Sequence, residues 1–252
     1  MTKKILASPQ TFVIGDIHGG YKALLQCIER SGINPETDTL ISLGDVADGW
    51  PEVPECFDKL LEFKHIYIIG NHDDWLLSWF RTRSTPDIWI QQGGQATLDA
   101  YQKMLNKGEF DRISNHQNIL EHALPSYVDD DNNLFVHGGI DWHSDSQSRH
   151  DMMWDRHMWE VACFWERREP DKTFDKYKLV FIGHTTTAWL NEETLTWQRG
   201  KLNSLKPIKA SNVWNLDQGG GYEGKLTIMN VETEEYWQSD IVKTLYPDAK
   251  LR

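Results

Sequence analysis

Cysteine is scarce in this sequence, which has three cysteines among 252 residues. An odd number of widely spaced thiols (Cys27, Cys56 and Cys163) provides no disulfide framework. We therefore expect buried, inert thiols in a reducing compartment. The first ten residues contain two lysines but lack the apolar run of a secretory signal, so the expected location is the cytoplasm.

Long apolar runs and excess positive charge are also missing. No segment approaches the roughly 18 consecutive apolar residues that favour a membrane-spanning helix, so we expect no membrane association. The 26 basic and 38 acidic side chains give a net charge of −12. Sequence-independent nucleic-acid binding requires a basic surface and is not expected. A phosphorylated ligand is still allowed, because bound divalent cations reverse the charge locally.

Short apolar runs alternate with amphipathic segments in the first third of the chain. This pattern predicts strands at Thr11–Ile14, Thr39–Leu43 and His65–Ile69, with helices at Tyr21–Ser31 and Glu52–Phe63 between them. Two successive strand–helix–strand units indicate parallel strands with right-handed crossovers. The predicted fold class is therefore α/β.

The remainder of the chain is predicted to be mostly helical over residues 74–125, and strand patterns return afterwards. A tryptophan-rich helix is expected at Asp151–Arg168. The later strands are expected at Leu134–Val136, Leu179–Ile182, Val213–Leu216 and Lys225–Val231. The sequence has no fixed repeat, linker or composition break. We therefore expect residues 1–252 to form a single domain with a helical insertion at 74–125.

Metal-ligand residue types follow five of the predicted strands. They are Asp16, His18, Asp45, Asn71, His137 and His184. Ligands bind in the crevice outside the carboxyl ends of strands in open α/β sheets, so these side chains are expected to meet there. A single Gly-Asp pair or histidine is more often a turn or a surface residue. Five such fragments in order favour a functional site over five unrelated turns.

The ordered motifs are Gly15-Asp-Ile-His-Gly19, Gly44-Asp-Val-Ala-Asp48, Gly70-Asn-His-Asp73, His137-Gly-Gly139 and Gly183-His-Thr185. Together with Met153–Arg156 and Asn215–Thr227, they resemble the calcineurin-like metallophosphoesterases over about Thr11 to Val231. The most similar branch contains the phosphoprotein phosphatases, including the phage-lambda-type serine/threonine phosphatases. The resemblance implies a metallophosphoesterase-type β-sandwich of mixed sheets flanked by helices.

The resemblance also implies a two-metal site. Asp16, His18 and Asp45 would hold one ion, and Asp45 would bridge to a second ion completed by Asn71, His137 and His184. A hydroxide bridging the two ions would attack phosphorus. Mixed carboxylate, amide and imidazole ligands suit transition metals better than Ca²⁺. We expect two divalent ions, with Mn²⁺ the first choice and Fe or Zn²⁺ as alternatives.

Three further residues receive roles from the resemblance. His72 would be the general acid that protonates the leaving group, and Asp48 would orient it. Arg156 would bind phosphate oxygens through its planar guanidinium. The alternative for Asp48 is a turn-capping carboxylate. Without the resemblance, Arg156 would be interpreted as a helix-surface partner of Asp155 or Glu160.

The chain departs from the phosphatase pattern at Gly49, where that branch has a second phosphate-binding arginine, and at Ile69. Asp48 favours a phosphomonoesterase that acts on phosphoserine or phosphothreonine in a protein, or on a small phosphate ester. One alternative is a phosphodiesterase or a relative of the symmetrical dinucleoside tetraphosphate hydrolases. A more distant alternative is a non-catalytic scaffold that kept the fold.

Overall fold

Parallel strands from the first third of the chain form the centre of one sheet. The computed structural model describes residues 8–198 and 202–249. Strands β1 (Thr11–Ile14), β2 (Thr39–Ser42) and β3 (Lys64–Tyr67) are parallel neighbours, which confirms the pairing expected from the strand–helix–strand pattern. Strand β11 (Thr227–Asn230) pairs antiparallel with β1, and β12 (Tyr236–Gln238) pairs antiparallel with β11.

A second five-stranded sheet contains most of the later strands, in the order β4-β5-β6-β10-β9. Its members are β4 (Ser126–Val128), β5 (Leu134–Val136), β6 (Val180–Ile182), β9 (Ile208–Ala210) and β10 (Val213–Asn215). Strands β5, β6 and β10 are parallel, and the edge strands β4 and β9 are antiparallel to their neighbours. A separate hairpin joins β7 (Leu190–Asn191) to β8 (Thr196–Trp197).

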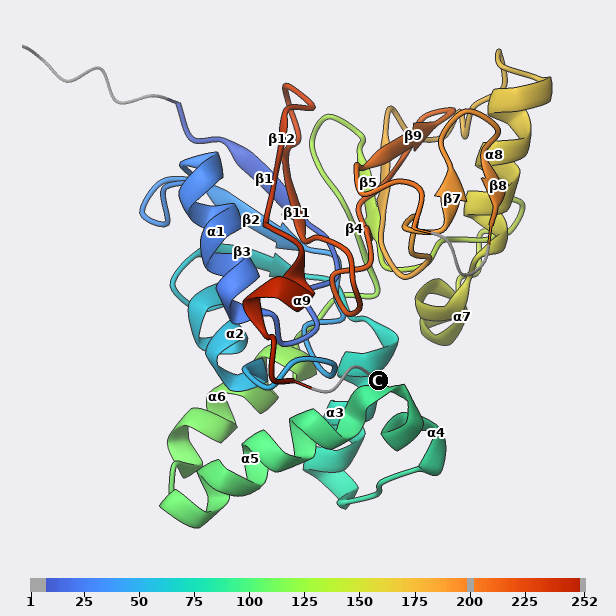
Figure 1. Cartoon of the computed structure of the whole chain (residues 1–252). Helices are drawn as coiled ribbons and strands as arrows, with labels where there is room; N and C mark the ends of the chain where they lie inside the picture. Colours follow the sequence, from blue (N-terminus) through green and yellow to red (C-terminus); the bar gives the residue numbers. More distant parts are fainter. Residues whose placement is uncertain (1–7, 199–201, 250–252) are drawn as a thin grey trace, which may run out of the picture.

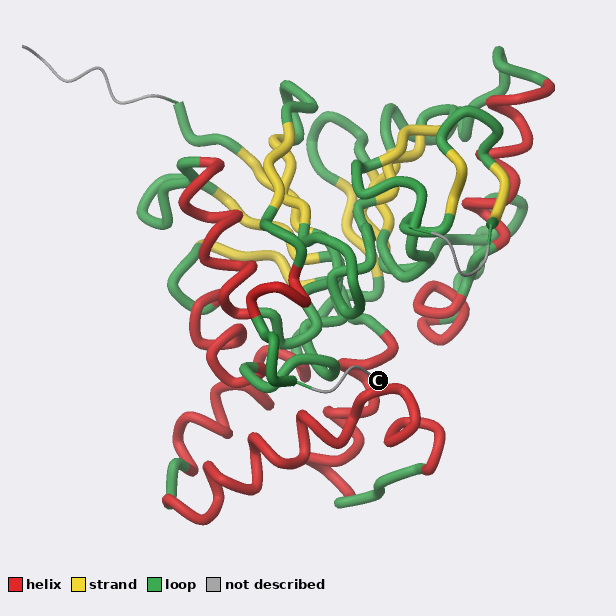
Figure 2. The backbone as a smooth tube through the Cα atoms, in the orientation of Figure 1, coloured by secondary structure: helices red, strands yellow, loops and turns green. Residues whose placement is uncertain are grey.

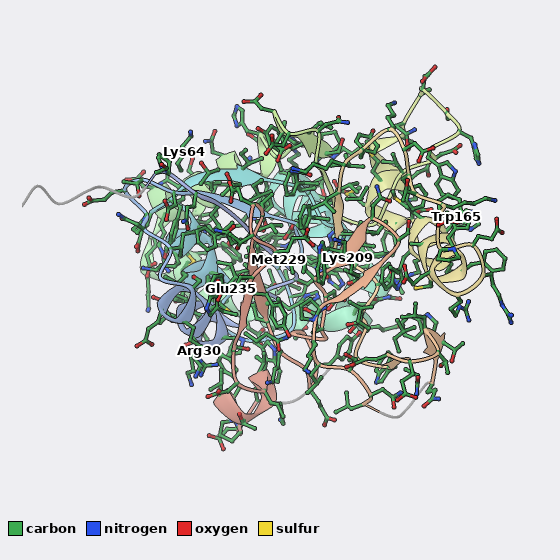
Figure 3. All side chains as sticks on the ribbon, turned by 90° about the horizontal axis from the view of Figure 1, so that it is seen from above. Arg30, Lys64, Trp165, Lys209, Met229 and Glu235 are labelled. Carbon is green, nitrogen blue, oxygen red and sulfur yellow. The ribbon has the colours of Figure 1, made fainter. Side chains whose placement is uncertain are left out.

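An apolar layer lies between the two sheets. Successive strand residues point to opposite faces, so alternate side chains of each sheet can enter this layer. Val13 and Met229 from the first sheet belong to the same buried cluster as Phe135 and Phe181 from the second. The two phenylalanine rings stack with centroids 5.0 Å apart. Figure 3, which views the molecule from above, shows Met229 near its middle.

Helices cover the outer faces of both sheets (Figures 1 and 2). Helices α1 (Tyr21–Ser31) and α2 (Val53–Leu60) lie beside the first sheet, and α8 (His157–Arg168) lies beside the second. The short α9 (Val242–Leu245) contacts α1 near the carboxyl end of the described chain. The resulting α/β architecture agrees with the expected sandwich of mixed sheets flanked by helices.

The segment between β3 and β4 is helical, as expected for residues 74–125. It contains α3 (Asn71–Thr82), α4 (Asp87–Trp89), the π-helical turn η1 (Ile90–Gly94), α5 (Gln95–Lys107) and α6 (Phe110–Glu121). The backbone leaves helical geometry inside η1, where Gln92 has ψ 19° and Gly93 has φ 99°. Figure 1 shows this helical group beneath the sheets, with α5 and α6 next to α2.

The continuous helix expected at Asp151–Arg168 is wrong, because the chain breaks between α7 (Arg149–Trp154) and α8. Asp155 is extended, with ψ 137°, and its Oδ2 accepts a hydrogen bond from the backbone N–H of Met158 at 2.9 Å. An aspartate in this position caps a new helix, because its carboxylate satisfies a backbone donor that has no partner inside the helix. The break places Arg156 between the two helices.

The three cysteine side chains are free and buried, as expected. Burial raises the pKa of Cys56 well above its ordinary value and raises the pKa of Cys27 and Cys163 to about 12, so these thiols stay protonated near neutral pH. Among the described residues, every helix is too short or too polar to cross a lipid bilayer.

Candidate metal centre

The structure brings the predicted ligand residues together at the ends of five strands. Asp16 and His18 follow β1, Asp45 follows β2, and Asn71 opens α3 after β3; His137 and His184 follow β5 and β6. A cavity of about 170 Å³ lies at this junction. Its wall is formed by Asp16, His18, Asp45, Asn71, His72, Gln92, Trp154, Arg156, His184, Thr186, Trp189, Trp197, Asp217 and Tyr222.

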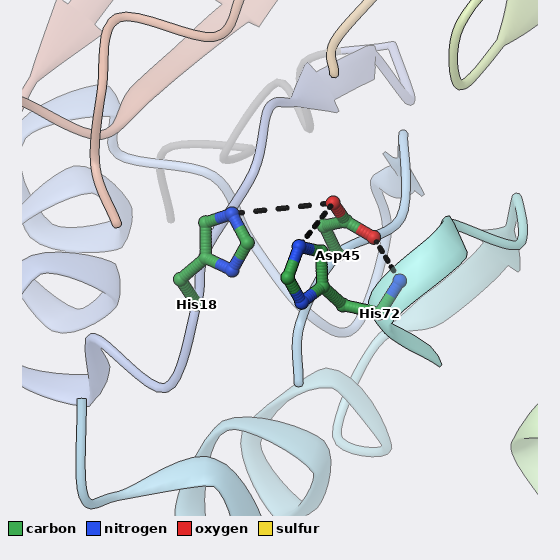
Figure 4. A group of neighbouring side chains, drawn as sticks. All are labelled: His18, Asp45 and His72. Atoms are coloured by element: carbon green, nitrogen blue, oxygen red, sulfur yellow. Dashed lines mark hydrogen bonds and ion pairs between the residues drawn. The ribbon is translucent and has the colours of Figure 1, made fainter. Parts of the chain in front are cut away.

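One group of ligand atoms contains His18, Asp45 and His72 (Figure 4). The Nδ1 atom of His18 lies 3.0 Å from the carbonyl oxygen of Ala47, and N–H donation there makes Nε2 the acceptor. This Nε2 lies 4.0 Å from Oδ2 of Asp45 and 3.9 Å from Oδ2 of Asp16. Backbone anchoring of one imidazole nitrogen is the usual way in which a histidine ligand is oriented.

A second group contains Asp45, His137 and His184. His137 uses the same device, with Nδ1 2.7 Å from the carbonyl oxygen of Leu43. Its Nε2 lies 3.3 Å from Oδ2 of Asp45 and 3.2 Å from Oδ1 of Asn71. Asp45 therefore belongs to both groups, which is the position that a bridging carboxylate needs.

Two glycines allow the carboxylates to approach the backbone closely. A Cβ atom at Gly70 would lie 2.1 Å from Oδ1 of Asp45, and one at Gly183 would lie 2.1 Å from Oδ1 of Asp16. Non-glycine residues with positive φ also gather here: His18 (49°), Asp45 (50°) and His184 (63°). Such backbone strain costs roughly 1–3 kcal/mol per residue and accumulates where function fixes the geometry.

The buried charges perturb one another. Burial and the nearby carboxylate of Asp217 raise the pKa of Asp16 well above its ordinary value. Burial alone would also raise the pKa of Asp45, but His137 and His72 hold it well below its usual range. For His137 burial lowers the pKa, yet Asp45 outweighs this effect and raises it to about 10.

The donor set fits two divalent cations. Buried carboxylates and imidazoles are normally paired, hydrogen-bonded or coordinated to metals. The Nε2 atom of His184 is buried, and no hydrogen-bond partner for it exists among the described residues. Positive charge between Asp16 and Asp45 would relieve the repulsion between these two carboxylates. Oxygen and imidazole donors together are typical ligands of divalent transition metals.

His72 lies between two carboxylates, with Asp45 near its Nε2 and Asp48 at its Nδ1. Its Nδ1 lies 2.6 Å from Oδ2 of Asp48, and its Nε2 lies 3.9 Å from Oδ2 of Asp45. Its position suits a proton donor that faces the cavity. Because Nε2 is also close to His18 and Asp45, the position alone would suit a metal ligand as well.

Arg156 reaches the same cavity from the break between α7 and α8. Its Nη1 donates to the carbonyl oxygen of His184 at 3.3 Å and lies 3.2 Å from Oγ1 of Thr185. In the part of the chain that the structure describes, it forms no ion pair with Asp155 or Glu160. The contacts therefore favour a cavity residue over a helix-surface partner.

Gly49 lies outside this cavity. It has φ 80°, and its N–H donates to the carbonyl oxygen of Gly93 at 3.3 Å. Its surface contributes to a different hollow, which is also lined by Lys22 and Tyr246. Gln92, next to Gly93, lies in the wall of the candidate site instead, and nothing in the sequence pattern pointed to it.

Asp73 and Asp217 lie inside the sequence motifs of the site, but the sequence pattern did not predict a role for either. Oδ1 of Asp73 accepts hydrogen bonds from the N–H groups of Val46 and Ala47, both at 3.0 Å, and its Oδ2 accepts from Gly70 at 3.2 Å. Asp73 thus joins the loops after β2 and β3. Asp217 lines the cavity, and its carboxylate raises the pKa of Asp16. The sequence signal that could have identified Asp73 and Asp217 is their position inside these two motifs.

Comparison with known proteins identifies a family model that matches most of this chain. Residues 10–195 match the model of the calcineurin-like phosphoesterases. Serine/threonine-protein phosphatase 1 of Salmonella typhimurium is 32% identical over 83 residues, which cover 33% of this chain and 38% of that protein. The symmetrical bis(5'-nucleosyl)-tetraphosphatase of Erwinia tasmaniensis is 30% identical over 133 residues, 52% of this chain and 44% of that protein. The matches thus span less than half of these relatives.

Solved structures agree at the level of the fold. A metallophosphoesterase from Sphaerobacter thermophilus has a TM-score of 0.54 and 16% identity, covering 92% of this chain and 89% of that chain. A protein serine/threonine phosphatase from Saccharomyces cerevisiae has a TM-score of 0.53 and 12% identity, covering 94% and 81%. With its sandwich fold and its potential metal ligands at the strand ends, and with a family match over most of its length, this chain belongs to the calcineurin-like phosphoesterases, a metal-dependent family.

Proposed function

We propose that this protein hydrolyses phosphate esters at a two-metal centre, with phosphomonoesters as its main substrates. The observation that carries the proposal is the position of Asp45, which lines the cavity and belongs to both groups of ligand atoms. One ion would be held by Asp16, His18 and Asp45, and the other by Asp45 with Asn71, His137 and His184. Two divalent cations supply Lewis acidity and an activated water in such centres.

The surrounding side chains would handle the phosphate and the proton. Arg156 would donate two parallel hydrogen bonds to phosphate oxygens. His72 would donate a proton from Nε2 to the oxygen of the leaving group, and Asp48 would hold the opposite ring nitrogen. A positioned acid of this kind is worth about 10²–10⁴-fold when the leaving group is a poor one.

The proposed substrates are phosphoserine or phosphothreonine in a protein, or a small phosphate ester. Asp48 supports this choice, because alkoxide leaving groups need the proton that an oriented His72 supplies. The relative in Salmonella typhimurium named as a serine/threonine-protein phosphatase points in the same direction. Mn²⁺ is the proposed metal, because carboxylate and amide oxygens suit it, and Fe and Zn²⁺ are the alternatives, because imidazole nitrogens suit them. The cytoplasm is the proposed location, supported by three buried, unpaired thiols.

A second candidate is hydrolysis of a phosphodiester or a dinucleoside polyphosphate. Four aromatic side chains line the cavity: Trp154, Trp189, Trp197 and Tyr222. The ring centroid of Trp189 lies 6.4 Å from that of Trp197 and 5.9 Å from that of Tyr222. Aromatic faces stack on nucleobases. A phosphodiester also carries one negative charge fewer than a phosphomonoester dianion, so Arg156 alone can match it.

The test is a substrate panel on metal-reconstituted protein. Metal should be removed with a chelator, returned as Mn²⁺, Zn²⁺ or Fe²⁺, and measured by mass spectrometry. Each form should then be assayed with a phosphopeptide, p-nitrophenyl phosphate, bis-p-nitrophenyl phosphate and diadenosine tetraphosphate. Preference for the phosphopeptide supports the first candidate, and preference for either of the last two supports the second. Metal-loaded protein that hydrolyses none of the four would favour a non-catalytic scaffold.

A further inference from the structure

The carboxylate of Asp48 is fully buried and surrounded by hydrogen-bond donors. Its Oδ2 accepts from Nδ1 of His72 at 2.6 Å and from Nε1 of Trp89 at 2.8 Å. Its Oδ1 accepts from the hydroxyl of Thr97 at 2.6 Å, and the same hydroxyl oxygen accepts from the N–H of Asp48 at 2.8 Å. Trp89 and Thr97 are themselves buried. They come from α4 and α5, more than 40 residues away along the chain.

The backbone of this helical segment is shaped around the indole of Trp89. A Cβ atom at Gly94 would lie 2.6 Å from Nε1 of Trp89 and 2.7 Å from its Cδ1. Only glycine therefore leaves room for the ring in its present position. The bond from Gly49 to the carbonyl oxygen of Gly93 attaches the same turn to the loop that carries Asp48. A π-helical turn such as η1 is rare and often marks a functional position.

The hydrogen-bonding groups of Trp89 and Thr97 determine what each side chain can do at Asp48. An indole N–H only donates, and a threonine hydroxyl that already accepts from a backbone N–H has one proton to give. Both protons are directed at Asp48, so the carboxylate meets donors on both oxygens and is held as an acceptor. A carboxylate at Nδ1 accepts one N–H of the His72 imidazolium, so the second ring proton, on Nε2, faces the cavity and is the one that can be donated.

We propose that Trp89 and Thr97 are positioning residues that orient the proton-donating His72 through Asp48. The proposal rests on the proposed hydrolysis and deepens it, because it gives the helical segment a part in the chemistry. Neither residue would touch substrate. Each would fix one oxygen of a carboxylate whose direction determines where the imidazole can deliver a proton.

Kinetics with two leaving groups separates positioning from general damage. Trp89→Phe keeps the ring and removes the N–H, and Thr97→Val keeps the shape and removes the hydroxyl. A hydrogen bond to a charged group is worth enough that each variant should lose roughly tenfold in kcat for an alkyl phosphate. The loss should be much smaller for p-nitrophenyl phosphate, whose leaving group needs little protonation. Thr97→Ser should restore the rate, and metal content should stay at the wild-type level.

Matched controls and a double-mutant cycle complete the experiment. Trp79→Phe changes a buried tryptophan of the same helical group whose ring contacts Phe80 and Tyr101, and it should leave the ratio of the two rates unchanged. In an Asp48→Asn background, Trp89→Phe should have no further effect on that ratio, because the acceptor it serves has been altered. Equal losses for both esters, or a full effect in the Asp48→Asn background, would overturn the proposal.

A readout without catalysis distinguishes this proposal from the proposed function. In protein loaded with Zn²⁺, which is diamagnetic, the Nδ1 proton of His72 should give a low-field ¹H NMR signal that Asp48→Asn removes. Trp89→Phe and Thr97→Val should move this signal, and Trp79→Phe should not. If wild-type protein hydrolyses neither ester but the signal responds as expected, only the proposed function fails. If wild-type protein is active and neither signal nor rate ratio responds, the positioning role fails.

Discussion

The backbone N–H of His72 donates to Oδ1 of Asp45 across 2.9 Å, so the first turn of α3 holds one oxygen of this carboxylate. The other oxygen, Oδ2, faces the Nε2 atoms of His18, His72 and His137 at 4.0, 3.9 and 3.3 Å. One side of Asp45 is thus fixed by the protein, and the other is directed at the place where cations would bind.

Asp45→Asn should reduce metal content and activity together. The amide oxygen would keep the bond to His72, and the amide NH₂ would then point at the cations in place of Oδ2. Asparagine tolerates the positive φ of 50° at this position, so the backbone should be unaffected. The measurement is metal per chain by mass spectrometry beside kcat. Asp130→Asn, at an exposed aspartate, is the control, and full metal occupancy with full turnover in Asp45→Asn would contradict the assignment.

His72→Asn should separate chemistry from metal binding. If His72 is the proton donor, both metals stay bound and kcat falls by about 10²-fold or more for alkyl phosphates, and by much less for p-nitrophenyl phosphate. If His72 is a ligand, metal content falls and both substrates lose equally. Metal analysis and the ratio of the two rates therefore decide between the two roles that its position allows.

Arg156→Lys should not restore the phosphate binding of the wild-type arginine. A lysine ammonium is a point charge and lacks the planar fork that holds two phosphate oxygens at once. We expect KM for monoesters to rise by about tenfold in Arg156→Ala, and Arg156→Lys to recover only part of this loss. Arg167→Lys, on the helix α8 that follows Arg156, is the control and should leave KM unchanged. Equal KM values for wild type and Arg156→Ala would remove Arg156 from the phosphate site.

Gln92→Arg, in preference to Gly49→Arg, should supply a second phosphate-binding arginine. Gly49 has a positive φ and lines another hollow, so an arginine there would be strained and directed elsewhere. Gln92 lies in the wall of the candidate site. Gln92→Arg should lower KM for p-nitrophenyl phosphate and raise it for bis-p-nitrophenyl phosphate, because the dianion gains more from the added charge. Gln91→Arg, at an exposed neighbour, should change neither value.

Acid should destabilise the fold through His116, away from the metal centre. Its Nε2 lies 2.8 Å from Oδ1 of Asp58, and its Nδ1 lies 3.0 Å from the hydroxyl of Tyr101. Burial lowers the pKa of His116, against the opposing effect of Asp58. As pH falls below about 6.5, the pKa of an unfolded histidine, His116 binds a proton in the unfolded chain but not in the folded chain. The free energy of unfolding therefore decreases as pH falls.

Urea unfolding at pH 8, 6.5 and 5 measures this effect. The difference in unfolding free energy between wild type and His116→Gln should shrink toward pH 5, since glutamine does not titrate. Asp58 adds a loss at lower pH. Burial would raise its pKa, but hydrogen bonds from Arg112 and His116 lower it, so its contribution is present above about pH 4 and disappears as pH falls through the lowered value. A difference that is constant over the whole range would exclude His116 as the titrating group.

Much of the fold was predictable from local pattern. The strands after which Asp16, Asp45 and Asn71 follow are short apolar runs ended by glycine, and helical periodicity fills the intervals between them. The parallel order followed from that alternation, because right-handed crossovers leave few other arrangements. The continuous helix through Asp155 was not correctly predicted. The periodicity of this segment is helical throughout. The break depends on the hydrogen bond from the N–H of Met158 to the carboxylate of Asp155, which local periodicity does not predict.

The sequence by itself determined the ligand types, their order and their positions after strands, because these depend on local periodicity and on the chemistry of each residue. Only the tertiary structure decided which residues support them. Trp89 and Thr97 reach Asp48 across more than 40 residues, and Gln92 enters the cavity through a backbone kink next to Gly93. No periodicity records such contacts. They arise when helices that are distant along the chain pack beneath the sheet and bring their buried hydrogen-bond donors to the one carboxylate that needs them.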